Sequence, residues 1–204
     1  MRYAPLREKQ ITEIMRMKGI RTVSDLTTEN ICIAFDIDLH FEPRRSRCIF
    51  EDDFAVVILD SRLPRLQQRG KFFHELSHII AHVGDQKRLN EPFKDLQETQ
   101  AYWISLYTSM PRYLFEPAAI KYQSIQKLQQ IFDLPEDMII ARFESIKRER
   151  KRQEFQYKMA RSESKRRPKS LQPGQVYDST LSILNQLKNQ VGEERLSYEV
   201  KRLL

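Results

Sequence analysis

The sequence predicts an α+β fold that is mostly helical, with a small antiparallel β-sheet and further helices at the C-terminal end. Two patterns favour this fold. Apolar residues recur at spacings of three and four over most of the chain, which is typical of helices, whereas residues 37–60 hold short apolar stretches with the length of strands. The length of 204 residues, of which 40% are hydrophobic, suits one domain with an appendage.

The N-terminal part of the chain supplies the predicted sheet. Helices are expected over residues 5–19 and 26–35, followed by a short strand over residues 37–41, where side chains alternate in polarity. Residues 47–50 and 54–60 then form a hairpin around Glu51, Asp52 and Asp53. Because strands joined by a tight turn pair in opposite directions, we expect the sheet to be antiparallel.

A helix is predicted from about residue 65 to residue 82, because five apolar side chains form one stripe along it: Phe72, Leu76, Ile79, Ile80 and Val83. On this helix His74 and His78 lie four residues apart, one above the other on the same face, so both imidazoles can bind one metal ion. Glu75 lies about 100° further round the helix, where its carboxylate can reach a water molecule on the metal without binding the metal itself.

This is the H-E-x-x-H arrangement of zinc peptidases. The alternative is a chance match, in which two histidines satisfy their hydrogen bonds on a buried helix. The chain has four histidines, and three of them lie between His74 and His82. This clustering favours the metal site.

A catalytic zinc site has three protein ligands and leaves a fourth position for water. His82 lies eight residues after His74, a rise of about 12 Å along a straight helix, whereas ligands of one tetrahedral zinc lie roughly 3–3.5 Å apart. His82 is therefore expected beside the ligands or in packing contacts. The third ligand is then expected on the next helix, over residues 93–110, where Glu98 is the best candidate and Asp95, one turn earlier, is its rival.

Three stretches of the sequence resemble a known family. Residues 69–78 contain the H-E-x-x-H motif, residues 96–101 place Glu98 shortly before an alanine, and residues 106–111 end in Met110 and Pro111. Together they resemble the ImmA/IrrE family of bacterial and phage metallopeptidases, and the resemblance extends over about residues 20–145. Ser77 departs from the glycine or cysteine that is frequent at this position of the family.

The resemblance implies a minimal zincin-like metallopeptidase fold. It implies that His74, His78 and Glu98 bind Zn²⁺ in a gluzincin-like site and that Glu75 is the catalytic glutamate. It also implies the substrate, a repressor-type DNA-binding protein that controls transcription of a phage or mobile element.

Two further features are candidates for the substrate cleft. Tyr102 lies one turn after Glu98 on the same helix face, so its hydroxyl is a candidate for stabilising the oxyanion, and a plain core position is the alternative. In related zinc peptidases the strand before the active helix pairs with an extended substrate. By this analogy the hairpin of residues 47–60 is the candidate substrate edge, and a plain core strand is the alternative.

The sequence divides after the expected metallopeptidase domain of residues 1–116. Residues 117–158 are expected to form a helix-turn-helix-like segment packed on that domain, with helices over 120–132 and 136–157. Residues 159–175 read as a basic linker that contains two prolines, and residues 176–204 as a C-terminal helical hairpin with its second helix over 193–204.

Positive charge is concentrated around that linker. Residues 147–169 hold 11 Lys and Arg against 3 Asp and Glu, a net charge of +8 (11 − 3), while the whole chain carries +7. Such a run binds nucleic acid or an acidic partner, or it is a solvated helix end that grades into a linker.

The lead hypothesis is a zinc-dependent endopeptidase. The alternative is a non-catalytic antirepressor, a protein- or DNA-binding module with a structural or vestigial metal site, and direct DNA binding by the basic segment is a third hypothesis. Glu75 favours the enzyme, because a structural site has no use for a carboxylate between two ligands. The longest apolar runs are too short to span a membrane and the N-terminus lacks the apolar region of a signal peptide, so we expect a cytoplasmic protein.

Overall fold

The computed structural model describes residues 4–51, 54–81, 91–166, 174 and 176–204. The chain forms two compact units, Met1–Glu149 and Arg150–Leu204. The first unit combines helices with a three-stranded sheet, so the predicted α+β class is confirmed. The predicted boundaries after residues 116, 158 and 175 stay predictions.

The first unit begins with three helical elements and the sheet. They are α1 (Ala4–Met17), the 3-10 helix η1 (Val23–Leu26), α2 (Thr28–Phe35), β1 (Ile37–Glu42), β2 (Arg47–Glu51) and β3 (Phe54–Asp60). Asp36 ends α2 with a left-handed backbone, φ 55°, which short polar residues tolerate better than most, and so turns the chain directly into β1.

The sheet has the strand order β1-β3-β2 and is mixed. The predicted hairpin of β2 and β3 is antiparallel, but β1 lies parallel to β3, so the prediction of a wholly antiparallel sheet is wrong. The link between β1 and β2 explains the difference, because it crosses the end of β3 and puts the two strands on opposite sides of it. Two hydrogen bonds hold it there: Asp60 N donates to Ser46 Oγ at 3.0 Å, and Ser61 N donates to Glu42 O at 2.9 Å.

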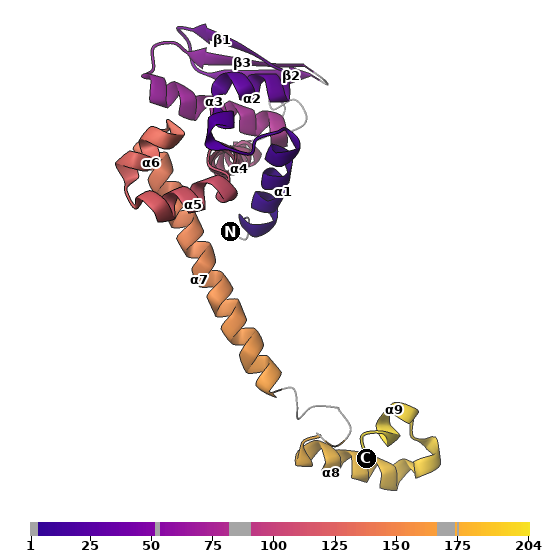
Figure 1. Ribbon diagram of the computed structural model, residues 1–204. Helices are drawn as coiled ribbons and strands as arrows, with labels where there is room; N and C mark the ends of the chain where they lie inside the picture. The colour runs from indigo at the N-terminus through magenta and orange to yellow at the C-terminus, as the bar shows by residue number, and fades with distance from the viewer. Residues whose placement is uncertain (1–3, 52–53, 82–90, 167–173, 175) are drawn as a thin grey trace. The chain divides into compact units, whose positions relative to one another are not determined.

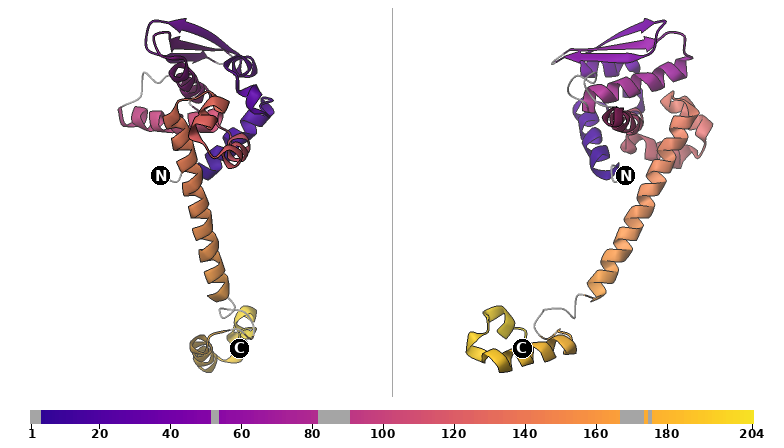
Figure 2. Two further views of the ribbon diagram at one scale, coloured as in Figure 1. Left: turned by 60° about the vertical axis from the view of Figure 1, so that its left-hand side comes forward. Right: turned by 180° about the vertical axis from the view of Figure 1, so that it is seen from behind.

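Helices α2 and α3 (Arg65–Ala81) lie against the same face of the sheet, and α4 (Glu91–Ser109) packs on α3 (Figure 1). The two further views of Figure 2 show the same layering. The core between these layers is apolar, and its largest fully buried side chains include Phe72, Phe73 and Leu76 of α3. The hydrophobic side of α3 is thus fixed, which leaves its other side for the polar residues of the motif.

Three more helices complete the first unit: α5 (Arg112–Tyr122), α6 (Ile125–Phe132) and the first part of α7 (Glu136–Arg166). The single helix predicted over residues 120–132 is wrong, because α5 ends at Gln123, which has φ 48°, and Ser124 caps α6 through Lys127 N. Asp133 ends α6 in the same left-handed conformation. The turn predicted between residues 132 and 136 is present, but α7 continues to Arg166, beyond the predicted end at residue 157.

Helix α7 begins in close contact with α3. Gly70 makes this approach possible, since a Cβ atom there would lie 3.1 Å from Met138 Sδ and 3.4 Å from Pro135 Cγ. Arg65 of α3 also holds the turn between α6 and α7, because its guanidinium group forms a bidentate ion pair with Asp133, at 2.5 and 2.7 Å. Residues 133–138 are therefore packed on the helix that carries the motif.

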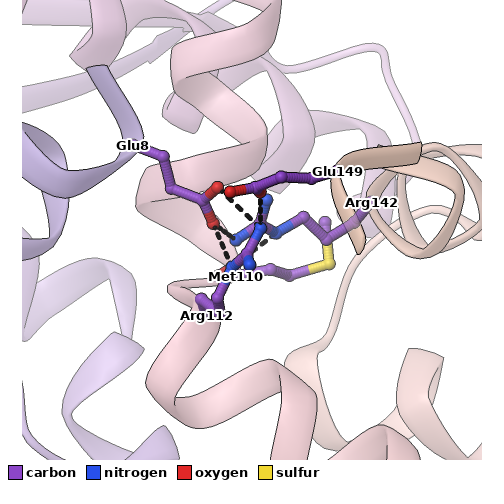
Figure 3. Close-up of polar contacts among 5 residues, drawn as sticks. All are labelled: Glu8, Met110, Arg112, Arg142 and Glu149. Atoms are coloured by element: carbon purple, nitrogen blue, oxygen red, sulfur yellow. Dashed lines mark hydrogen bonds and ion pairs between the residues drawn. The ribbon is translucent and has the colours of Figure 1, made fainter. Parts of the chain in front are cut away.

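A buried cluster of four charged side chains joins α1, α5 and α7, and we call it the charge network (Figure 3). Arg112 donates to both oxygens of Glu8, at 3.0 and 2.9 Å, and also to Glu149. Arg142, which is 0% exposed, donates to Glu8 and, at 2.9 Å, to the backbone oxygen of Met110. Burial would raise the pKa of Glu8, but Arg142 and Arg112 hold it below its ordinary value.

The second unit holds the rest of α7, α8 (Asp178–Val191), the 3-10 helix η4 (Glu193–Arg195) and α9 (Tyr198–Lys201). The continuous helix predicted over residues 193–204 is interrupted, because Ser197 caps a new helix by accepting a hydrogen bond from Val200 N. In neither unit is any described helix both long enough and apolar enough to cross a membrane.

Candidate metal centre and active site

Three side chains from α3 and α4 bring their donor atoms together, and we call them the metal-ligand triad: His74, His78 and Glu98. The Nε2 atoms of His74 and His78 lie 3.2 Å apart, as expected for residues one above the other on a helix. Glu98 reaches across from α4, with one oxygen 3.2 Å from His74 Nε2 and the other 3.5 Å from His78 Nε2.

These separations fit a tetrahedral zinc ion. Four ligands at ~2.0–2.2 Å from zinc lie about 3.3–3.6 Å from one another. The two histidine nitrogens are 3.2 Å apart, and each lies close to that range from one of the two Glu98 oxygens, at 3.2 and 3.5 Å. Two imidazoles with one carboxylate are a donor set that catalytic zinc uses. The residues present therefore fit the metal that the sequence predicts.

The structure distinguishes between the two acidic candidates. Glu98 belongs to the triad and Asp95 does not, although both lie on α4. His82, predicted to lie beside the ligands, falls outside the described residues. The roles of the triad as ligands stay a prediction, which the geometry supports.

The environments of the two histidines suit metal binding. Burial is the main cause that lowers the pKa of His74, with smaller contributions from Lys71 and Arg45, and this favours the neutral imidazole that binds metals. The side chain of His78 is only 4% exposed, whereas that of Glu98 is 56% exposed. The triad is thus closed on the side of α3 and open to solvent on the side of Glu98.

Glu75 is buried, with 7% of its surface exposed. Burial raises its pKa to about 7, and Glu98 adds to the effect, whereas the neighbouring Cys48 thiol and Lys71 oppose it. A carboxyl group with this pKa can both accept and release a proton near neutral pH. Such a group is suited to general-base catalysis beside the triad.

The contact between Cys48 and Glu75 was not predicted from the sequence. Burial and the Glu75 carboxylate both raise the pKa of the Cys48 thiol far above its ordinary value, so the thiol stays protonated and acts as a weak donor to Glu75. The alternation along β2, which places Cys48 and Phe50 on the face that packs toward the core, was the signal that could have found this contact.

A cleft of about 680 Å³ gives access to this site. Its lining includes the triad, Glu75, Cys48, Asp60, Leu63, Lys71 and the residues 44–47. The edge strand β2 supplies Arg47 and Cys48, so the predicted substrate edge does border the cleft. Tyr102 is not among the lining residues, and its charged neighbours are Asp137 and Arg148 of α7. Its proposed role at the oxyanion rests on the sequence alone.

Two curated proteins of Bacillus subtilis (strain 168) are similar in sequence. The phage-like element PBSX protein XkdA is 24% identical over 196 residues, which are 95% of this chain and 94% of that protein. The uncharacterized protein YqaB is 26% identical over 124 residues, which are 61% of this chain and 72% of that protein. A solved structure of a Mycobacterium tuberculosis transcriptional regulator matches 65% of this chain and 44% of its own, at 15% identity and a TM-score of 0.46.

The family assignment rests on a larger match. Residues 34–144, which span the sheet, both helices of the triad and the start of α7, match the family of IrrE N-terminal-like domains (Peptidase_M78). Membership of this family indicates a metallopeptidase-like or antirepressor-type function. This match covers more than half of the sequence, and we conclude that the chain belongs to the IrrE N-terminal-like (Peptidase_M78) family.

Proposed function

We propose that this chain is a zinc-dependent endopeptidase that cleaves a protein substrate, a transcriptional repressor of a phage or mobile element. The observation that carries the proposal is the convergence of two imidazole nitrogens, 3.2 Å apart, with the two oxygens of Glu98, which lie 3.2 and 3.5 Å from them, beside a buried carboxyl group in the lining of an open cleft. A binding module has no need for the carboxyl group in this position. The family supports the peptidase class, and the similarity to a protein of a phage-like element supports the class of substrate.

In the proposed reaction, His74, His78 and Glu98 hold the metal. A bound zinc ion supplies Lewis acidity, which lowers the pKa of its water to roughly 7. Glu75 accepts a proton from the attacking water, and later donates it to the amine that leaves when the C–N bond breaks. The Cys48 thiol holds the Glu75 carboxylate from the side of β2.

The edge of β2 positions the substrate in this proposal. Among the described residues β2 pairs only with β3, and its end borders the cleft. An extended peptide can therefore add to the sheet through backbone hydrogen bonds and run past Glu75. In this proposal the scissile peptide bond of such a segment lies beside the triad.

Glu75→Gln tests the proposal, because it keeps the length of the side chain and removes its charge. We expect zinc content and folding to stay unchanged while the rate of repressor cleavage falls by about 10²- to 10⁴-fold. The substrate should still bind and remain uncut. Glu13→Gln, an exposed change on α1, is the matched control and should cleave at the wild-type rate.

The measurement is cleavage of a repressor encoded by the same mobile element, followed by gel electrophoresis and mass spectrometry. A metal assay on the same samples shows that the site is intact. If the Glu75→Gln protein relieves repression as well as the wild type, cleavage is not the mechanism, and the antirepressor hypothesis replaces this one.

A further inference from the structure

Four basic side chains line the cleft outside the triad: Arg44, Arg45, Arg47 and Lys71. Three of them belong to the link between β1 and β2 or to the first residue of β2, and Lys71 belongs to α3. Lys71 lies three residues before His74 and therefore on the same helix face, about one turn away. Positive charge thus flanks the triad from two different elements.

Three of these charges are available to a ligand. Arg44 pairs with Glu42 at 2.5 Å, and the lining carboxylate of Asp60 pairs with Arg62 at 2.7 Å. By contrast, Arg45, Arg47 and Lys71 are exposed, and within the described part of the chain none of them forms an ion pair or a side-chain hydrogen bond. All three line the same cleft as the triad.

The carboxylates of Glu75 and Glu98 do not neutralise the unpaired basic side chains of the cleft when a metal ion is bound. Glu75 and Glu98 carry at most two negative charges between them, and one divalent cation held by the triad would balance both. The net charge of the metal-loaded cleft is therefore set by Arg45, Lys71 and the neighbouring Arg47, and it is positive. A cleft of one sign attracts ligands of the opposite sign and raises their local concentration.

We infer that this cleft selects substrate segments with acidic side chains close to the scissile bond, and that Arg45 and Lys71 recognise those side chains. The inference rests on the proposed peptidase function and names its substrate class. An exposed ion pair changes affinity by roughly 1.5- to 5-fold, so two pairs together give a preference of about 10-fold at low ionic strength. Salt should reduce it, because the Debye length is only about 10 Å at 0.1 M.

Two fluorescent peptide libraries test this inference. They share the same degenerate sequence except that one carries Asp and Glu at positions where the other carries Asn and Gln. Binding is measured by fluorescence anisotropy with the zinc-loaded Glu75→Gln protein, which should not cut the peptides, and cleavage is measured separately with the zinc-loaded wild type. We expect the acidic library to bind and to be cut about 10-fold better at low salt.

Variants in the Glu75→Gln background assign the preference to the two residues. Arg45→Gln/Lys71→Gln should abolish the preference, and Arg45→Glu/Lys71→Glu should reverse it. The matched control is Lys121→Glu/Lys127→Glu, which makes the same change of charge at exposed positions of α5 and α6 away from the cleft. The control should keep the preference.

Binding and cleavage together separate this inference from the proposed function. Preferential binding of the acidic library without any cleavage would support the inference and contradict the peptidase function. Cleavage of both libraries at equal rates would support the peptidase function and overturn the inference. Equal binding of the two libraries, absence of binding by either, or an undiminished preference in Arg45→Gln/Lys71→Gln would also overturn it.

Discussion

The metal-ligand triad with Glu75 and the charge network are both clusters of polar side chains held by helices, yet they balance their charges differently. The charge network contains two glutamates and two arginines, so the chain neutralises it from within. The site contains two carboxylates and two histidines, and burial disfavours protonation of His74. Among the described residues, no lysine or arginine pairs with Glu98 or Glu75.

The two clusters also differ in access to solvent. Arg142, in the charge network, is fully buried, whereas the side chain of Glu98, in the triad, is 56% exposed and lies in the wall of a cleft. A buried and internally neutral cluster joins elements of the fold. An open cluster with an excess of acidic groups favours the binding of a cation, and the cleft gives a substrate access to that cation. The comparison therefore favours a stabilising role for the charge network and agrees with the proposed catalytic role of the triad.

Breaking the charge network should have the largest effect on stability. Arg142→Met leaves Glu8 and Glu149 with a single arginine, and removal of one partner of a buried ion pair costs about 3–5 kcal/mol. Urea denaturation of the metal-free protein measures the loss. Lys151→Met, an exposed change on the same helix, should cost less than about 0.5 kcal/mol. A loss below about 1 kcal/mol for Arg142→Met would show that the network does not stabilise the fold.

Zinc should stabilise the wild-type protein by a smaller amount. A ligand that binds only the folded state adds about 2.7 kcal/mol when its concentration is 100 times its Kd. The same denaturation experiment with and without zinc measures this gain. The gain should vanish in His78→Ala and persist in Arg142→Met, because the two clusters are separate. An equal gain in His78→Ala would place the metal elsewhere.

A pH titration sharpens the comparison at Glu8. Its arginine partners hold the pKa of Glu8 below its ordinary value of 4.5, so its contribution to stability is present above pH 4.5 and is lost as the pH falls through the folded-state pKa. Glu8→Gln should therefore destabilise the protein by about 3–5 kcal/mol at pH 7, because it leaves the buried Arg142 without its carboxylate partner, and by less at lower pH. Glu13→Gln is the exposed control on the same helix. A difference between Glu8→Gln and wild type that stays constant with pH would contradict this account.

Much of the fold and the triad could be predicted because the relevant patterns are local. The apolar stripe of α3 fixes both its helical state and the face on which His74 and His78 meet. Glu98 was harder to predict as the third member of the triad, since its distance from the histidines depends on how α4 packs on α3. The sequence left Asp95 open for this reason, and the structure brings Glu98 to the site.

Long-range contacts could not be predicted from these patterns. The ion pair of Glu8 and Arg142 joins residues 134 positions apart, and nothing in their local sequence indicates a partner. The parallel pairing of β1 with β3 depends on the link that crosses the end of β3. The break at Gln123 was missed because its left-handed backbone, φ 48°, is uncommon for a residue other than glycine.

Metal analysis of purified protein tests the central claim most directly, that His74, His78 and Glu98 form a metal centre. We expect about one zinc per wild-type chain, and loss of zinc in His74→Ala, His78→Ala and Glu98→Ala. Asp95→Ala, which removes the other carboxylate of the same helix, should retain it. Full zinc content in Glu98→Ala, or loss of zinc in Asp95→Ala with Glu98 intact, would contradict the account.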